Sequence, residues 1–179
     1  MKILIVVDMQ HDFVDGALGT AEAKEIVPSV LAKVKGYEGE VIFTKDTHGE
    51  NYLDTREGKF LPVTHCIKGT AGWELLEELD EFCREKKCKV YEKDTFGSLK
   101  LAHDLAGRNA EGGMENEGIE EIELIGLCTD ICVVSNALLL KAAMPEMDIV
   151  VDASCCAGVT KEAHDAALCT MKSCQIQIH

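Results

Sequence analysis

The strongest constraint on the fold is an alternation of short apolar runs with longer segments of helical periodicity. Continuous apolar runs rich in β-branched residues are typical of strands covered on both faces. Such runs predict strands at residues 3–7, 41–44, 89–91, 122–125, 149–151 and 175–178. Apolar residues at helical spacing predict helices at residues 23–35, 73–86, 132–143 and 161–172. We therefore expect an α/β fold: a doubly wound, mostly parallel sheet of about six strands with helices on both faces.

Two segments interrupt this alternation. Residues 46–72 form a long stretch without regular periodicity that carries two histidines, and long loops in compact domains tend to be functional or disordered. Residues 107–121 contain paired glycines and five glutamates, which predicts an exposed acidic loop. Because no internal repeat or linker divides the chain, residues 1–179 are expected to form a single domain.

The charge balance limits the classes of partner. The chain has 179 residues, with 18 basic against 32 acidic side chains and a formal net charge of -14. Such an acidic protein is repelled by nucleic acid and by anionic membranes, so neither is expected as a partner. The apolar runs are all far shorter than the roughly 20 residues that span a bilayer. The N-terminus lacks the pattern of a signal peptide, so we expect a cytoplasmic protein.

Cysteine usage agrees with that location. The nine cysteines are an odd number, and no secretion signal accompanies them, so reduced thiols are expected rather than a disulfide framework. No two cysteines have the C-x-x-C spacing, which argues against a zinc ribbon and against a thioredoxin-type motif.

Polar side chains follow four of the predicted strands. Asp8 follows the first strand, Asp46 and His48 the second, Lys93 the third and Cys132 the fourth. In parallel sheets these carboxyl ends share one edge, where ligands bind. A thiol at the start of a helix, with a lysine to stabilise the thiolate and an aspartate to accept its proton, predicts a cysteine nucleophile. The alternative is a buried cysteine that only fills space in the core.

Acidic and histidine residues after the second strand have the composition of a metal site. Asp46 and His48 are two residues apart and share one face of an extended segment, and Glu57 and His65 follow in the same loop. Two carboxylates and two imidazoles suit zinc, iron(II) or manganese. Histidines that only form hydrogen bonds with their neighbours are the alternative.

Several stretches resemble the isochorismatase-like cysteine hydrolases. Residues 7–14 read VDMQHDFV and resemble the D-x-Q-x-D-F opening of that family, although His11 stands where asparagine is more usual. Residues 126–133 read GLCTDICV and closely resemble the nucleophile motif G-x-x-T-D-x-C-V. Residues 92–98 resemble the lysine segment. Residues 44–48, TKDTH, resemble the metal segment of nicotinamidases, and residues 65–72 the segment after it.

The resemblance covers almost the whole chain in the family's order and implies a mechanism. Asp8, Lys93 and Cys132 would be the catalytic triad of an amidohydrolase. Asp8 would take the thiol proton, the thiolate would attack an amide carbonyl, ammonia would leave, and water would cleave the thioester. The backbone amides of Cys128 and Cys132 would bind the oxyanion, with a cis peptide bond between Leu127 and Cys128.

The resemblance also implies one divalent metal ion, with zinc favoured and iron or manganese as alternatives. Many relatives have a histidine where this chain has asparagine and tyrosine at 51 and 52, whereas some nicotinamidases use a glutamate nine residues after the D-x-H histidine, the spacing found here. The implied ligands are Asp46, His48, Glu57 and His65. The metal would position the substrate through its pyridine nitrogen. The implied walls of the substrate pocket are Phe13, Trp73 and Leu127.

Nicotinamide, cleaved to nicotinate and ammonia, is the substrate that this resemblance favours. The closest alternative is an amidase of the same family that acts on a different small amide. A noncatalytic small-molecule binding or interaction protein on this fold is an alternative from another class. A flavodoxin-like binding module is disfavoured because it would need a phosphate-binding loop after a strand, and no G-x-G-x-x-G or P-loop pattern is present. The family resemblance further implies a homo-oligomer.

Overall fold

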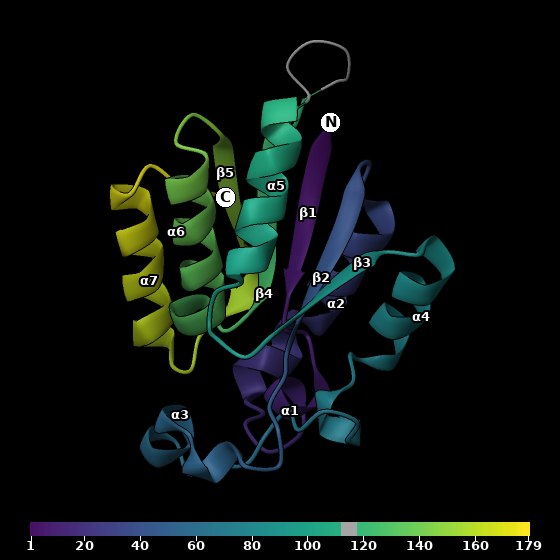
Figure 1. Ribbon diagram of the computed structural model, residues 1–179, viewed down its shortest axis with the longest axis vertical. Helices are drawn as coiled ribbons and strands as arrows, with labels where there is room; N and C mark the ends of the chain where they lie inside the picture. Colours follow the sequence, from purple (N-terminus) through teal and green to yellow (C-terminus); the bar gives the residue numbers. More distant parts are fainter. Residues whose placement is uncertain (112–117) are drawn as a thin grey trace.

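The computed structural model describes residues 1–111 and 118–179, and its centre is a six-stranded sheet (Figure 1). The strands lie in the order β3-β2-β1-β4-β5-β6, and each neighbouring pair is parallel. Their bounds are β1 Lys2–Val7, β2 Glu40–Asp46, β3 Lys89–Lys93, β4 Glu121–Leu127, β5 Asp148–Ala157 and β6 Gln177–Ile178. The prediction of a doubly wound parallel α/β sheet is confirmed.

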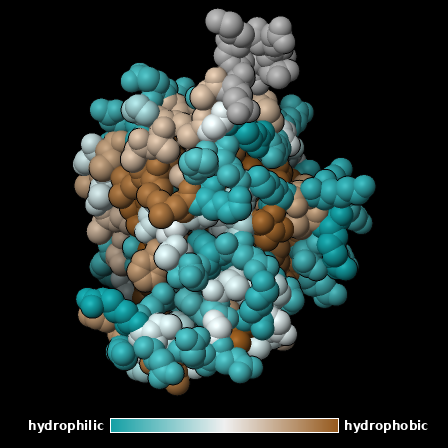
Figure 2. Space-filling model, in the orientation of Figure 1, coloured by the Kyte–Doolittle hydropathy of each residue, from teal (hydrophilic) through white to brown (hydrophobic). Residues whose placement is uncertain are grey.

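Seven α-helices occur in the described residues: α1 His11–Val14, α2 Ala21–Gly36, α3 Arg56–Phe60, α4 Glu77–Lys86, α5 Leu99–Glu111, α6 Val134–Ala143 and α7 Lys161–Ser173. Helices α5, α6 and α7 cover one face of the sheet, and α2 and α4 cover the other (Figure 1). Hydrophilic side chains cover the outer surface at α4 (Figure 2). No helix of the described residues is long and apolar enough to cross a membrane.

Two apolar cores result from the alternation of side chains along the strands. In β1, Ile3 and Ile5 contribute to the core beneath α5, α6 and α7, whereas Leu4 and Val6 contribute to the core beneath α2 and α4. All four side chains are fully buried. A central strand with both faces covered therefore reads as a continuous apolar run, which is why the sequence ILIVV predicted it.

Several predicted boundaries were wrong. The helix predicted from residue 73 begins at Glu77, because Trp73 ends a short 3₁₀ turn, Ala71–Trp73. The helix predicted from residue 132 begins at Val134, after a π-helical turn, Thr129–Val133. Strand β5 continues to Ala157, well beyond its apolar start. The sheet register shifts between β4 and β5 over this extension, so polar residues there do not end the strand.

The two irregular segments also contain helix. Residues 107–111 belong to α5, although they were predicted to begin an acidic loop, and residues 112–117 of that predicted loop lie outside the described residues. Within residues 46–72, a 3₁₀ turn at Tyr52–Asp54 precedes the short helix α3, whose N-cap, Thr55, accepts a hydrogen bond from the Gly58 N–H. Helix α3 lies beyond the carboxyl edge of the sheet (Figure 1). It is too short to produce a periodic pattern in the sequence.

The centre of the sheet requires one glycine. Gly126, near the end of β4, has a φ of 113°. A Cβ atom at this position would collide with the Val7 carbonyl oxygen on β1. Glycine thus allows β1 and β4 to approach closely at the point where the strand order reverses, which in such folds is where ligands bind.

Candidate active site

Three strand ends bring Asp8, Lys93 and Cys132 into contact. Asp8 directly follows β1 with a left-handed φ of 47°, Lys93 is the last residue of β3, and Cys132 lies in the turn after β4. The Lys93 Nζ lies 2.7 Å from Asp8 Oδ2 and 3.5 Å from Cys132 Sγ. All three side chains are buried. A cation, a carboxylate and a thiol therefore share one enclosed space.

The charges of this group depend on burial as well as on contact. Burial raises the pKa of the Cys132 thiol, the Asp8 carboxylate raises it further, and Lys93 only partly opposes this. Burial also raises the pKa of Asp8, which makes it a stronger base than an exposed aspartate. Burial disfavours the charged form of Lys93, but Asp8, Cys132 and Asp46 outweigh it and raise its pKa. The lysine is thus a permanent cation beside a protonated thiol and a basic carboxylate.

Two buried residues that were not predicted from the sequence, Thr44 and Asn136, hold Asp8 and Cys132 in place. The Thr44 hydroxyl on β2 donates to Asp8 Oδ1 at 2.6 Å, which leaves Oδ2 to face Lys93. The Asn136 side chain, on α6, donates to the Cys132 carbonyl at 2.8 Å and accepts from the Ser98 N–H at 2.9 Å. Asn136 is four residues after Cys132, and residues at this spacing lie on the same face of a helix. The sequence therefore contained a signal that Asn136 lies next to Cys132.

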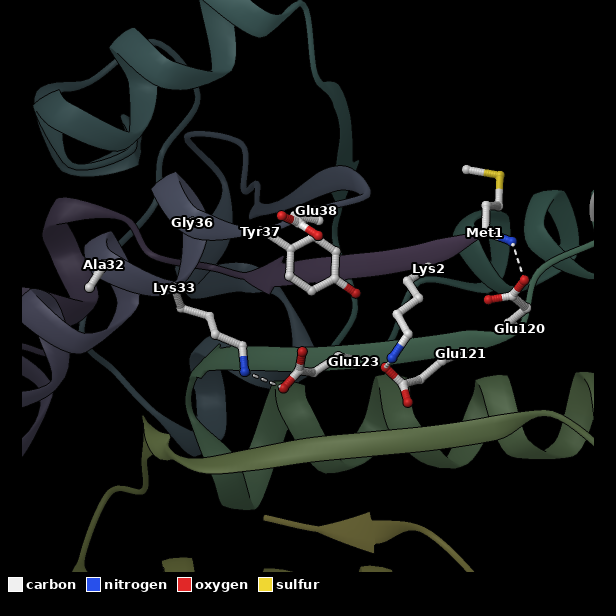
Figure 3. A pocket seen from close by; sticks show the side chains of 10 residues that line it. All are labelled: Met1, Lys2, Ala32, Lys33, Gly36, Tyr37, Glu38, Glu120, Glu121 and Glu123. Carbon is white, nitrogen blue, oxygen red and sulfur yellow. Dashed lines mark hydrogen bonds and ion pairs between the residues drawn. The ribbon is translucent and has the colours of Figure 1, made fainter.

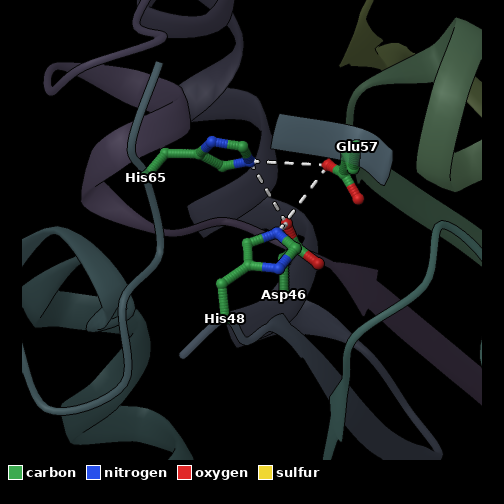
Figure 4. A group of neighbouring side chains, drawn as sticks. All are labelled: Asp46, His48, Glu57 and His65. Atoms are coloured by element: carbon green, nitrogen blue, oxygen red, sulfur yellow. Dashed lines mark hydrogen bonds and ion pairs between the residues drawn. The ribbon is translucent and has the colours of Figure 1, made fainter. Parts of the chain in front are cut away.

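Asp46, His48, Glu57 and His65 converge in a second cluster, in which their side chains point toward one another (Figure 4). One ligand atom from each lies within 4.8 Å of all the others. His48 Nε2 lies 3.0 Å from Asp46 Oδ2, and His65 Nε2 lies 3.8 Å from Glu57 Oε1. Three of the four side chains are buried, and Glu57 is partly exposed. The structure thus brings all four predicted ligands together.

The donor set fits a divalent transition metal. His65 Nδ1 lies 2.8 Å from the Val63 carbonyl oxygen, a hydrogen bond that leaves Nε2 free for a ligand bond, as is usual for metal-binding histidines. Hydrogen bonds from His48 and His65, with the Lys93 cation, overcome the effect of burial and hold the pKa of Asp46 below its usual range. Burial and the nearby Asp46 charge raise the pKa of Glu57. A bound cation would relieve this repulsion between carboxylates.

A cavity of about 370 Å³ opens onto both groups. Its floor includes Cys132, Cys128 and Asp46, and its walls are mostly apolar. The predicted wall residues Phe13 and Leu127 line it. Trp73 does not: its indole N–H donates to the Thr47 hydroxyl at 2.8 Å, and the Lys45 ammonium lies 3.2 Å from the ring centroid. This polar contact and the cation hold the ring outside the cavity.

The peptide bond between Leu127 and Cys128 is cis, as the resemblance implies. Cys128 is also the N-cap of the turn that contains Cys132, and its carbonyl accepts from the Ile131 and Val133 N–H groups at 3.0 Å each. The turn therefore has a fixed shape around the nucleophile candidate. The role of the Cys128 and Cys132 amides as an oxyanion hole stays a prediction.

A broader hollow lies at the opposite, amino end of the sheet (Figure 3). Lys33 Nζ lies 2.6 Å from Glu123, and Lys2 Nζ lies 3.0 Å from Glu121. The two lysines of this hollow are thus each paired with a carboxylate. In parallel sheets ligands bind at the carboxyl ends of the strands, so we assign the functional site to the cavity above Cys132.

Comparison with known proteins identifies the family. The sequence model of the isochorismatase domain matches residues 2–178. The chain belongs to the isochorismatase family. It is 26% identical to a nicotinamidase/pyrazinamidase of Mycobacterium tuberculosis, in an alignment that covers 99% of this chain and 98% of that protein. The predicted family is therefore confirmed.

Solved structures of the same family have the same fold. A nicotinamidase/pyrazinamidase from Bacillus subtilis superposes with a TM-score of 0.82 at 28% identity, over 99% of this chain and 98% of that one. A pyrazinamidase from Pyrococcus horikoshii, solved in complex with zinc, superposes with a TM-score of 0.77 at 26% identity, over 99% and 98% of the two chains.

Proposed function

We propose that the protein hydrolyses nicotinamide to nicotinate and ammonia through a thioester on Cys132. The observation that carries the proposal is the position of Lys93 Nζ, 2.7 Å from Asp8 Oδ2 and 3.5 Å from Cys132 Sγ. Cys132 in turn lines a cavity that also reaches Asp46. The general prediction that the protein is an amide-hydrolysing enzyme is confirmed by its family membership and by relatives named as nicotinamidases.

The chemistry begins with a proton transfer from the Cys132 thiol to Asp8, whose pKa is raised by burial. The thiolate, stabilised by Lys93, adds to the carboxamide carbon, and the C=O electrons move to oxygen. The N–H groups of Cys128 and Cys132 would stabilise that oxyanion. When the oxyanion collapses, the C–N bond breaks and the Asp8 proton goes to the departing ammonia.

The second half returns the enzyme to its starting state. Asp8, ionised again, removes a proton from water, and the resulting hydroxide adds to the thioester carbon. Collapse of this second oxyanion breaks the C–S bond, and the sulfur recovers the proton from Asp8. Lys93 stays protonated throughout, because its pKa is raised by three acidic neighbours. Its role is to stabilise negative charge on whichever of Asp8 and Cys132 carries it.

A divalent metal would be held by Asp46, His48, Glu57 and His65. When bound, it supplies a Lewis acid that orients the pyridine nitrogen of the substrate. Zinc is the favoured ion, supported by the zinc complex of the Pyrococcus relative, and iron or manganese are alternatives. The cluster borders the same cavity as Cys132, through Asp46 and Glu57, so a small ring can reach both.

The remaining predictions extend this assignment. A single domain, a cytoplasmic location and a homo-oligomeric assembly stay predictions. The rival substrates are other small amides, for which the triad would be unchanged. A noncatalytic binding protein is the rival from another class, and it would not require the thiol of Cys132.

Ammonia release from nicotinamide by the zinc-loaded protein tests the proposal, with Cys132→Ala measured in parallel. We expect turnover in the unsubstituted protein and none above background in the variant. Absence of turnover by the folded, zinc-loaded protein would overturn nicotinamide as substrate. Turnover that survives in Cys132→Ala would overturn the thioester mechanism.

A further inference from the structure

Four large apolar side chains surround the mouth of the active-site cavity and remain exposed to water. Phe60 is 81% exposed, Val159 49%, Phe96 47% and Leu61 38%. All four line the cavity above Cys132. They come from three separate segments: the end of α3, the loop after β3 and the loop after β5. Exposed apolar groups gathered from distant parts of a chain are typical of a binding surface.

We propose that this apolar rim, formed by Phe60, Leu61, Phe96 and Val159, binds an uncharged apolar substituent on the ring of the amide. The substrate class is then aromatic amides that carry an alkyl group on the ring edge opposite the reactive one. This inference rests on the proposed amidase function and names the substrates for which the site is best suited.

Two anchored positions of the substrate, its carboxamide carbon and its ring nitrogen, determine which edge of the ring faces the rim. The carboxamide carbon must lie beside Cys132, and the ring nitrogen must face the cluster that contains Asp46. In nicotinamide these two positions flank a single ring carbon, so that edge faces the floor. The opposite carbon, position 5 of the ring, then faces the mouth. A substituent at position 5 would therefore meet the apolar rim.

The size of the cavity supports a ligand larger than nicotinamide. Its volume of about 370 Å³ lies in the range of pockets that hold drug-sized molecules, about 300–1,000 Å³, whereas a single pyridine ring with one amide group is far smaller. The upper part of the cavity is apolar, so a small polar substrate leaves it filled with water. Displacing that water by a hydrocarbon group is favourable.

The charges along the cavity determine which substituents it accepts. Its lining includes the carboxylates of Asp46 and Glu57, and among the described residues that line it there is no lysine or arginine. An anionic substituent would thus lose hydration without gaining a partner. Neutral alkyl groups fit the rim, and carboxylated groups of the same length do not.

The test compares kcat/KM of the zinc-loaded enzyme for nicotinamide, 5-methylnicotinamide, 5-propylnicotinamide and 5-(2-carboxyethyl)nicotinamide. Complete burial of one methylene is expected to raise kcat/KM by about fourfold. Even with its three carbons only partly buried, the propyl compound should have a kcat/KM at least about tenfold that of nicotinamide. The carboxyethyl compound should gain nothing. A kcat/KM that stays flat or falls along the alkyl series would overturn the proposal.

A binding measurement separates this proposal from the proposed function. Calorimetric titration of zinc-loaded Cys132→Ala with the same amides reports affinity without turnover. If nicotinamide is not hydrolysed, the proposed function fails, yet dissociation constants that fall along the alkyl series still support the rim as a subsite. Dissociation constants that do not fall along the series would overturn the rim proposal even if nicotinamide is a good substrate.

Matched variants assign the effect to the rim. Phe60→Ala removes the most exposed rim side chain, at the end of α3, and should reduce the ratio of propyl to unsubstituted kcat/KM by severalfold. Leu99→Ala is the control, because Leu99 is 72% exposed but does not line the cavity. The ratio should be unchanged in Leu99→Ala. A ratio that is also unchanged in Phe60→Ala would contradict the assignment.

Discussion

The carboxylate of Asp46 joins the two halves of the site, because Oδ1 lies 3.4 Å from Lys93 Nζ while Oδ2 lies 3.0 Å from His48 Nε2. Its side chain is buried, so neither contact is weakened by water. We therefore expect a change at Asp46 to act on the candidate metal cluster and on the Lys93–Cys132 pair together, and a change at Glu57 to act on the cluster alone.

We expect Asp46→Asn and Glu57→Gln to weaken zinc binding, each by about 100-fold or more, because each removes a charged ligand. Only Asp46→Asn should alter the thiol. The Asp46 charge raises the pKa of Cys132, so its removal lowers that pKa and increases the thiolate fraction at mildly alkaline pH. Alkylation of Cys132 in metal-free protein should then accelerate, up to about tenfold for a pKa change of one unit.

Zinc competition with a chromophoric chelator measures the first effect, and mass spectrometry of the Cys132 peptide during alkylation measures the second. Glu57→Gln is the matched control for the thiol, since Glu57 belongs to the same cluster, whereas it is Asp46 that contacts Lys93. Equal alkylation rates in both variants would show that Asp46 does not couple the two groups.

Removal of the nucleophile should abolish turnover without unfolding the protein. For Cys132→Ala we expect kcat for nicotinamide to fall by about 10³-fold or more, because no other group can form the acyl intermediate. Cys155→Ala is the control: Cys155 is also a buried cysteine, but it does not line the cavity. Ammonia release gives the rates, and circular dichroism verifies folding. Similar losses in both variants would mean that cavities in the core, rather than lost chemistry, cause the effect.

Asn136 is expected to position the nucleophile. In Asn136→Ala the Ser98 N–H and the Cys132 carbonyl lose their partner, and each unsatisfied buried group costs about 1–3 kcal/mol of unfolding free energy. We also expect kcat to fall by about 10- to 100-fold, because the Cys132 turn is no longer joined to the loop after β3.

Urea unfolding and steady-state kinetics of Asn136→Ala separate these effects, with Ser135→Ala, the preceding residue of α6, as the control. Our interpretation requires that kcat falls while KM changes little, under conditions where the variant is fully folded. If the folded variant has a normal kcat, Asn136 contributes to stability only, and the proposed positioning role is wrong.

Metal affinity should fall as the pH is lowered. Burial tends to lower the pKa of His65, but hydrogen bonds to Asp46 and Val63 and the charge of Glu57 outweigh it and raise the pKa above its usual value of about 6.5. A protonated histidine cannot bind metal, so protons compete with zinc as the pH falls through this raised pKa. Affinity is thus highest above it, and chelator competition across the neutral range measures the change. Affinity that is constant from mildly alkaline to mildly acidic pH would contradict this.

The convergence of the candidate site residues was predictable from the sequence because these residues lie at strand ends. Asp8, Lys93 and Cys132 each follow an apolar run, and a parallel sheet brings such positions to one edge whatever the loops between them do. Asp46 and His48 were placed by the same argument. The positions of Glu57 and His65 needed the family resemblance, since nothing local in residues 46–72 fixes how that segment folds back.

What the sequence did not predict depends on tertiary contacts. Trp73 is a plausible wall residue by type, yet its indole pairs with Thr47 and Lys45 instead of facing the cavity. The hydrogen bonds of Thr44 and Asn136 could not be predicted, because their partners are distant in the sequence or depend on the fold of the turn after β4. The apolar rim was missed because Phe60, Phe96 and Val159 lie in three separate segments of the sequence, and only the folded chain brings them together.

The division between strand ends and loops has a practical consequence for protein engineering. The groups proposed to react are anchored to the central sheet, where Gly126 and the buried strands tolerate little change. The rim is carried by α3 and by two loops outside the sheet, and surface segments accept substitution far more readily. Libraries confined to the rim would therefore vary the proposed substituent site while leaving Asp8, Lys93 and Cys132 and their surroundings unchanged.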